Sequence, residues 1–265
     1  MGLIALLPEI ENEPDSVFVM HEKSEKLIPL HVHSKGQLSY VEGGIAYITI
    51  DYRTFVVPAR HYFWIPKGIW HVVRVGQFAT VFRSLYFYTE RDENHPFYST
   101  LGIYPAHELL IQMINYTERW DSQHITASHE NFDFLVGLKK LLPTLNNRAI
   151  PIILPITDDP KMNRIVGYLE ENIAEPLGLK NVSAHFNMSE RSFTRLFQQT
   201  LKISFLQYLK SLRMIKAIEM IMKTNMQITE IGENVGYQNI GSFSNAFFEF
   251  TNSRPSDFRR HDQFN

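Results

Sequence analysis

The chain has 265 residues, of which 44% are hydrophobic and 13% aromatic, so it is long enough for two domains with buried cores. Charged residues make up 20% of the chain without long runs of one sign, a composition that excludes an intrinsically disordered protein. The chain has no cysteine, which excludes disulfides and thiol chemistry, and any metal ion must be bound by histidine, carboxylate or amide groups.

The first residues, 1–7, are apolar, but the segment is short and lacks the basic start of a signal peptide. No apolar run reaches the length that spans a membrane. We therefore expect a cytoplasmic protein without a membrane partner.

Residues 27–88 contain short β-rich runs, separated by Gly-Gly, Pro and Pro-Lys-Gly breaks. Many short, closely spaced strands favour a small barrel or sandwich. The expected strands are Gln37–Val41, Ile45–Asp51, Thr54–Val57, Tyr62–Ile65, His71–Val75 and Thr80–Tyr88.

Two histidines near the start of this region, His31 and His33, are separated by a single residue. Side chains on a strand repeat every two residues, so we expect both imidazoles on one face. With the residues that follow, they resemble the two short motifs of the cupin fold, in which two His, a Glu and a further His converge on a metal ion. The motif residues are His31, His33, Gln37 in the Glu position, Gly43-Gly44 and the run from Pro66 to His71.

The resemblance implies a barrel with an interior site. That site takes either a divalent metal ion or a small effector held by hydrogen bonds, and the residues leave both open, so no cofactor is certain. A neutral amide oxygen from Gln37 is a weaker metal ligand than a carboxylate. The candidate metal ligands are His31, His33, Gln37 and His71, and the candidate effector pocket adds Tyr40 and Trp64.

Two helices are expected next, because apolar residues recur at helical spacing in 106–120 and 129–142. They can pack on the barrel or on a copy of themselves in a homodimer. Three prolines between residues 146 and 160 predict a linker, and Asp158 and Asp159 before Pro160 predict a helix start. The expected domains are 1–147 and 161–262, joined by a linker at 148–160.

The stretch from Leu179 to Arg260 contains one pattern twice, fifty residues apart. A long apolar helix at about 204–223 joins the copies, which predicts two helix-turn-helix units at about 179–200 and 228–251. Each unit offers one exposed helix to a DNA groove. The matching residues are Phe193, Phe197 and Tyr208 in the first copy and Phe243, Phe247 and Phe258 in the second.

In the first unit, Ser189 is the expected N-cap of the exposed helix, and Phe193 and Phe197 point inward at helical spacing. Arg can fork onto guanine and Gln onto adenine, so the outward residues suit base reading. The chain carries a net charge of −2, but residues 180–223 hold eight Lys and Arg against two acids, which makes this unit basic. The candidate DNA-contacting residues are Ser189, Arg191, Ser192, Thr194, Arg195 and Gln198.

In the second unit the candidate DNA-contacting residues are Ser242 and Asn245, the latter in the place of Arg195. Phe248 and Glu249 also point outward, and they are poor partners for a polyanion. Residues 224–253 contain no Lys or Arg and three Glu. We therefore expect this unit to contribute less affinity than the first.

These two units resemble the AraC/XylS family of bacterial transcription regulators over roughly residues 160–261. The first-unit pattern is present as Ser189, Phe193, Arg195, Phe197, Ser204, Tyr208, Arg213, Ala217 and Ile221. The second-unit pattern is present as Ile228, Ile231, Gly236, Tyr237, Phe243, Phe247, Pro255, Phe258 and Arg259. The chain departs from the family in having Ser183 and Gly232 where Ala is usual, and Lys202 and Asn252 where Gly is usual.

The resemblance implies an α+β protein of two domains, with an N-terminal cupin-like β-barrel with flanking helices and a C-terminal all-α tandem helix-turn-helix domain. The implied partners are double-stranded promoter DNA, an unknown small-molecule effector, a second copy of the chain and RNA polymerase. The alternatives are a metal-dependent cupin enzyme with a helical appendage, or a DNA-binding protein whose barrel binds no ligand.

Overall fold

The computed structural model describes residues 3–22, 27–51, 53–75, 81–90, 92–145, 153–155, 157–251 and 253–262. The chain divides into two compact units, one of 1–51 with 56–151 and the other of 52–55 with 152–265. The first is mainly β and the second mainly α, which confirms the predicted α+β, two-domain fold. Within the described residues, no helix combines the length and apolar character needed to cross a membrane.

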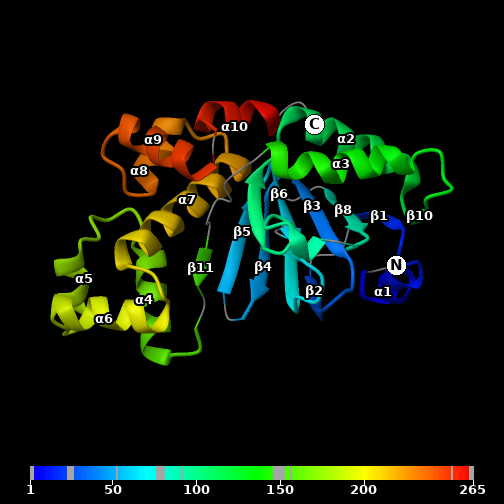
Figure 1. Ribbon diagram of the computed structural model, residues 1–265. Helices are drawn as coiled ribbons and strands as arrows, with labels where there is room; N and C mark the ends of the chain where they lie inside the picture. The colour runs from blue at the N-terminus through cyan, green and yellow to red at the C-terminus, as the bar shows by residue number, and fades with distance from the viewer. Residues whose placement is uncertain are drawn as a thin grey trace. The chain divides into compact units, whose positions relative to one another are not determined.

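A six-stranded antiparallel sheet lies at the centre of the N-terminal unit (Figure 1). Its inner strands β3 and β6 are buried along almost their whole length, so both faces of the sheet are covered. Gln37 in β3 lies opposite Tyr86 on one side and Ile65 on the other. The strand order is β10 (Gln123–Ile125), β1 (Val17–Glu22), β8 (Val81–Phe87), β3 (Gly36–Glu42), β6 (His61–Ile65) and β9 (Gly102–Pro105).

A second antiparallel sheet contains four strands of the predicted region, in the order β5 (Arg53–Pro58), β4 (Ile45–Ile50), β7 (His71–Val75) and β2 (Leu27–His31). Buried and exposed residues alternate in β7, so this sheet buries one face. The chain passes from β3 to β4 through Gly43 and Gly44, whose φ angles of 74° and 64° lie in the left-handed region that glycine adopts without strain.

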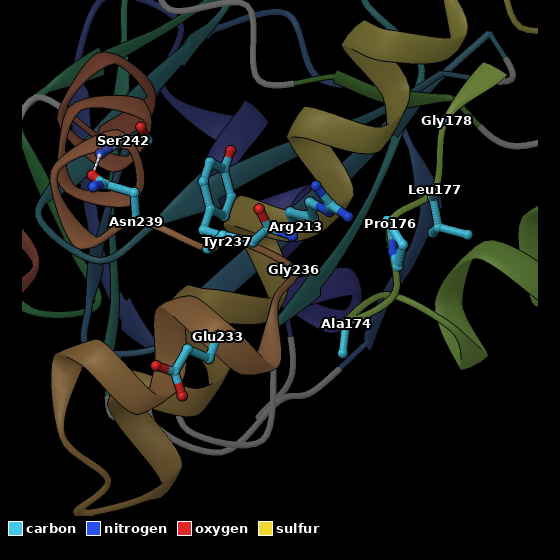
Figure 2. Close-up of a pocket in the computed structure, with 11 residues that line it drawn as sticks. Ala174, Pro176, Leu177, Gly178, Arg213, Glu233, Gly236, Tyr237, Asn239 and Ser242 are labelled. Carbon is cyan, nitrogen blue, oxygen red and sulfur yellow. Dashed lines mark hydrogen bonds between the residues drawn. The ribbon is translucent and has the colours of Figure 1, made fainter.

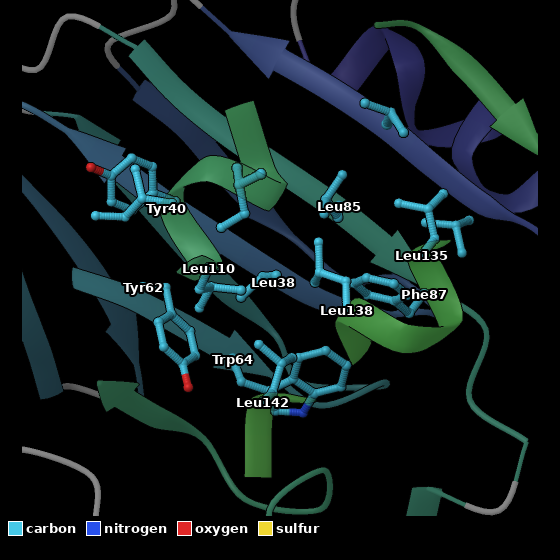
Figure 3. Close-up of a cluster of buried hydrophobic side chains, with 14 of the residues drawn as sticks. Leu38, Tyr40, Tyr62, Trp64, Leu85, Phe87, Leu110, Leu135, Leu138 and Leu142 are labelled. Atoms are coloured by element: carbon cyan, nitrogen blue, oxygen red, sulfur yellow. The ribbon is translucent and has the colours of Figure 1, made fainter. Parts of the chain in front are cut away.

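Two helices cover the outer face of the six-stranded sheet, as the helical spacing predicted. They are α2 (Glu108–Tyr116), continued by a 3-10 turn at Thr117–Trp120, and α3 (Phe132–Leu145). Figure 3 shows Leu110 and Leu138 from these helices packed against Leu38, Trp64 and Phe87 of the sheet. The helix α1 (Leu3–Asn12) precedes β1, and neither was predicted.

The C-terminal unit begins with a short strand where the sequence predicted linker. Residues Ile153–Pro155 form β11 and pair with Arg53–Phe55. Asp159 then caps the next helix by accepting a hydrogen bond from the Met162 amide at 2.7 Å, as predicted. The helices are α4 (Pro160–Glu171), α5 (Leu179–His185), α6 (Glu190–Thr200), α7 (Phe205–Lys223), α8 (Ile228–Asn234), α9 (Ile240–Thr251) and α10 (Pro255–Asp262).

The helix α7 is shared by the two helix-turn-helix units. Its N-terminus is closed by a capping box between Ser204 and Gln207. It contacts α6 of the first unit and both α8 and α9 of the second. Each unit therefore has its own aromatic core, and α7 is common to both.

We expect Gly236→Ala to destabilise the C-terminal unit by about 2 kcal/mol or more, because Gly236 has a φ of 82° and an L-residue is strained there. A Cβ would also lie 2.4 Å from Arg213 Nη2 and 2.6 Å from the Ile173 carbonyl oxygen. Urea unfolding followed by far-ultraviolet circular dichroism measures the loss.

Gly167→Ala is the matched control, because a Cβ there meets nothing within 4 Å among the described atoms. Gly167 lies inside α4, so alanine should stabilise the unit by about 0.5–1 kcal/mol. Equal effects of the two substitutions would contradict the assignment of strain to Gly236.

Candidate functional site

The exposed helix of the first unit is α6, and its outward face follows from its N-cap and its aromatic anchors. Ser189 Oγ accepts a hydrogen bond from the Ser192 amide at 3.2 Å, which fixes the start of the helix. Phe193 and Phe197 are fully buried. Of the six predicted contact residues of this unit, Ser192 is half-buried and the other five are exposed: Ser189, Arg191, Thr194, Arg195 and Gln198.

The end of α6 adds a further exposed cation. Lys202 follows the helix with a φ of 59°, in the left-handed conformation for which glycine is usual. Ser183 and Gly232, which replace alanine in the first helices, are both buried, in keeping with close helix crossing. The fourth departure from the family pattern, Asn252, lies outside the described residues.

The second exposed helix, α9, repeats this arrangement. Phe243 and Phe247 are fully buried, while Ser242 and Asn245 are exposed. Ser242 donates its amide hydrogen to Asn239 Oδ1 at 3.0 Å at the start of the helix. The structure thus places both predicted residues of this unit on one outward face.

The negative charge expected on α9 is paired. Lys210 of α7 lies 2.6 Å from Glu249 Oε2 and holds the pKa of that carboxyl below its usual range. Lys210, which is distant in sequence, therefore offsets charge on Glu249, and the expectation that Glu249 is a poor partner for DNA stays a prediction.

Arg254 is a candidate residue that the sequence patterns missed. It is exposed, directly precedes α10, and its Nη1 donates to Asn245 Oδ1 at 3.0 Å. Its guanidinium carbon lies 4.9 Å from the centre of the Phe248 ring. Its counterpart fifty residues earlier in the repeat is Ser204, which is not basic, so only the return of the chain onto α9 reveals it.

A groove of about 660 Å³ lies between the two helix-turn-helix units (Figure 2). Gly178 of the first unit and Ser242 of the second both line it. Arg213 of α7 lies between Tyr237 and Pro176, and its Nη2 donates to the Glu175 carbonyl oxygen at 2.9 Å. This arginine therefore connects the loop before the first unit with the turn of the second.

The three predicted histidines of the N-terminal unit do converge. One ligand nitrogen of each lies within 4.8 Å of the others, and all three residues are buried. His31 and His71 are register partners on β2 and β7. The expected strand face is only half correct, because β2 ends at His31 and His33 lies beyond it.

The hydrogen bonds of this cluster fix which nitrogen faces its centre. Each Nδ1 lies 2.6–2.8 Å from a backbone carbonyl oxygen, so in His31 and His71 Nδ1 carries the proton and Nε2 keeps its lone pair. Among the described residues, His31 Nε2 and His71 Nε2 have no hydrogen-bond partner. His33 Nε2 lies 3.0 Å from Gln37 Oε1, whose amide nitrogen donates to Ser39.

The cluster therefore holds several acceptors and few donors. Three imidazole nitrogens and one amide oxygen suit a divalent cation such as Zn²⁺, Fe²⁺ or Mn²⁺. The carbonyl partners of the Nδ1 atoms orient the rings as such partners do around metal ions. The residues present fit a metal ion, and they equally fit a ligand that donates hydrogen bonds.

Tyr40 and Trp64, the other two candidate pocket residues, lie elsewhere. Both belong to the core under α2 and α3 (Figure 3). Trp64 Nε1 donates to the Tyr98 carbonyl oxygen in that core, at 2.9 Å. Adjacent strand residues face opposite sides, so with Gln37 toward the histidines, Tyr40 points to the helices.

Burial keeps the histidines of this unit neutral. It lowers the pKa of His31 and His33, and it lowers the pKa of His71 to about 3, helped by the charge that His31 would carry. The buried His61, which lies outside the cluster, has a pKa lowered to about 4 for the same reason. Neutral imidazole is the form that binds metal ions or accepts hydrogen bonds.

Two family models match the chain. Residues 182–261 match a helix-turn-helix domain, and residues 16–94 match an AraC-like ligand-binding domain. The first range contains α6 and α9, and the second contains the histidine cluster. Together they define a DNA-binding domain and a ligand-binding domain on one chain.

Similar proteins carry the same assignment. The transcriptional regulator GbdR of Pseudomonas aeruginosa is 34% identical over 104 residues, which are 39% of this chain and 28% of GbdR. The regulator NimR of Escherichia coli is 25% identical over 242 residues, 91% of this chain and 85% of NimR. Among solved structures, the C-terminal domain of AraT from Geobacillus stearothermophilus is 34% identical, covers 38% of this chain and 85% of its own, and has a TM-score of 0.37.

The chain therefore carries an AraC-type helix-turn-helix domain and an AraC-like ligand-binding domain, and its relatives are transcription regulators of the AraC family. It spans a little over a quarter of the length of GbdR and most of the length of NimR.

We expect His61 to make the N-terminal unit sensitive to acid. Its pKa is about 4 when folded and near 6.5 when unfolded, so the unfolded chain binds the proton first. The stability is present above pH 6.5 and is lost as the pH falls toward 4, by about 2 kcal/mol between pH 7 and pH 5. Tryptophan fluorescence during urea unfolding reports this, since Trp64, Trp70 and Trp120 all lie in this unit.

His61→Asn keeps an N–H where Nδ1 donates to the Ala59 carbonyl oxygen, at 3.0 Å, but does not titrate. The variant should lose less stability than the wild-type chain over the same pH range. An identical pH dependence in both would exclude His61 as a source of the acid sensitivity.

Proposed function

We propose that this chain is a sequence-specific regulator that binds double-stranded promoter DNA through α6 and α9, in response to a small-molecule effector in its N-terminal unit. It acts in the cytoplasm as a homodimer, with RNA polymerase as a further partner. The observation that carries the proposal is that both helix-turn-helix units bury their phenylalanines and expose the polar residues between them.

The chemistry of α6 supports direct base reading. Arg191 and Arg195 are one turn apart on the exposed face, with Thr194 and Gln198 beside them. An arginine fork matches guanine in the major groove, and a glutamine amide matches adenine. Two such helices on one chain suit adjacent major-groove segments, which are about 34 Å apart along one face of DNA.

The interior of the N-terminal unit supports effector binding. The family model that matches it describes a ligand-binding domain. Gln37, Ser39 and Ser84 form a buried hydrogen-bonded chain next to the histidines. An effector regulates DNA binding only if it binds two states of the protein with different affinity.

A divalent cation is a second candidate occupant, favoured by the converging Nε2 atoms of His31, His33 and His71. The residues named for it are these three histidines and Gln37. The similar proteins are transcription regulators, which supports a role for such an ion in a regulator and not in the metal-dependent enzyme considered as the alternative.

We expect Arg195→Ala to weaken binding to a duplex of promoter DNA by about 1–3 kcal/mol, because a fork to a base is lost. Asn245→Ala should cost less, since an amide forms fewer charge-assisted contacts. Gel-shift titrations over a range of salt concentrations measure both. Arg164→Ala, at an exposed position on α4, is the control.

The absence of salt-sensitive binding by the wild-type chain to DNA from its own upstream region would contradict the proposed function. Equal losses in the Arg195 and Asn245 variants would contradict only the ranking of the two units.

We expect Mn²⁺ or Zn²⁺ to raise the thermal stability of the N-terminal unit, by about 2.7 kcal/mol at one hundred times the dissociation constant. His33→Ala should abolish this increase, because it removes one of the three converging nitrogens. His61→Ala removes a buried histidine outside the cluster and should leave the increase intact. A response that survives in the His33 variant would contradict binding of the ion at this cluster, and no response at all would argue for an uncharged ligand.

A further inference from the structure

The second helix-turn-helix unit presents two features that do not suit a DNA-binding surface by themselves. Phe248 is 41% exposed on the outward face of α9, beside Glu249. The segment that contains α8 and α9 has no Lys or Arg of its own. A helix that approaches a polyanion needs positive charge, and here it must come from outside the unit.

Two residues from outside supply that charge. Lys210 pairs with Glu249 at 2.6 Å and cancels its charge. Arg254 then leaves the face of α9 with one excess positive charge.

Arg254 is held in place on α9 through one end of its guanidinium. Nη1 donates to Asn245 Oδ1 at 3.0 Å and lies 3.3 Å from Ser244 Oγ. The guanidinium also lies over the Phe248 ring, with 4.9 Å between its central carbon and the ring centre. An arginine that stacks on an aromatic ring keeps its orientation at low entropic cost.

The same contacts explain both unexpected features. The exposed Phe248 ring is the surface on which the guanidinium packs, and Arg254, held by Asn245, supplies the positive charge that α8 and α9 lack. Among the described residues, the hydrogen bonds of this guanidinium all use Nη1, which leaves Nε and Nη2 available to an acceptor on DNA. Arginine forks of this kind bind phosphate oxygens in pairs.

We propose that Arg254 is the DNA-contacting cation of the second helix-turn-helix unit, and that it donates to a backbone phosphate of the segment that α9 approaches. This inference rests on the proposed DNA-binding function. It assigns to Arg254, Asn245 and Phe248 a joint role in which the arginine contacts the phosphate and the other two position it.

The test compares full-length variants on one promoter duplex across a series of salt concentrations. Arg254→Gln keeps an amide that can bond to Asn245 but removes the charge. We expect it to bind about tenfold more weakly at low salt, with a salt slope smaller by about one, because one phosphate contact is lost. Arg254→Lys keeps the charge and should retain the slope.

Phe248→Ala separates charge from positioning. It removes the ring and leaves the cation, so we expect weaker binding with an unchanged salt slope. Circular dichroism checks that each variant is folded, and Arg164→Ala serves again as the matched loss of an exposed arginine, with no expected effect on the slope.

If Arg254→Gln binds with the affinity and salt slope of the wild-type chain while Arg195→Ala binds more weakly, the inference is overturned. The DNA-binding function would then still stand. A loss confined to one base pair of the site, with an unchanged slope, would also overturn the phosphate assignment. Failure of the wild-type chain to bind DNA in a salt-sensitive manner would refute the proposed function itself.

Discussion

Burial of two phenylalanines four residues apart determines the outward face of each exposed helix. Phe193 and Phe197 in α6, and Phe243 and Phe247 in α9, are all fully buried. Burying a phenylalanine side chain is worth about 1.5–3 kcal/mol, so a rotation that exposed both would cost several kcal/mol. The helix cannot turn, and the residues between the phenylalanines must face outward. The DNA-binding function depends on this constraint more than on any single arginine.

The same constraint makes the two units similar in shape and leaves their charges free to differ. In the first unit the cations Arg191 and Arg195 are part of the exposed helix itself. In the second, the cations come from α7 and from the residue before α10, through Lys210 and Arg254. The second copy of the repeat therefore keeps the same core while its positive charge comes from other segments of the chain. The composition of the copy itself does not reveal this charge.

The sequence predicted the C-terminal unit well, because its signals are local. Helical spacing of apolar residues and the cap at Ser189 depend on neighbours three or four positions away. The unpredicted parts depend on distant partners: β11 pairs with residues a hundred positions earlier, and Arg254 is recognised only by its contact with Asn245. In the N-terminal unit the histidines converged as predicted. Trp64 lies apart from them, because strand pairing determines which face of a sheet each residue occupies.

Among the described residues, the histidine cluster contains hydrogen-bond acceptors that have no matching donors. Leaving a buried polar group unpaired costs about 1–3 kcal/mol, and both His31 Nε2 and His71 Nε2 lack a partner among the described residues. Protonation cannot relieve this near neutral pH, because burial holds the pKa of His71 at about 3. A cation or a hydrogen-bond donor that entered would satisfy these atoms together. The unpaired nitrogens therefore give a cation or a donor ligand a reason to bind at the cluster, and regulation further requires that this occupant bind two states of the protein with different affinity.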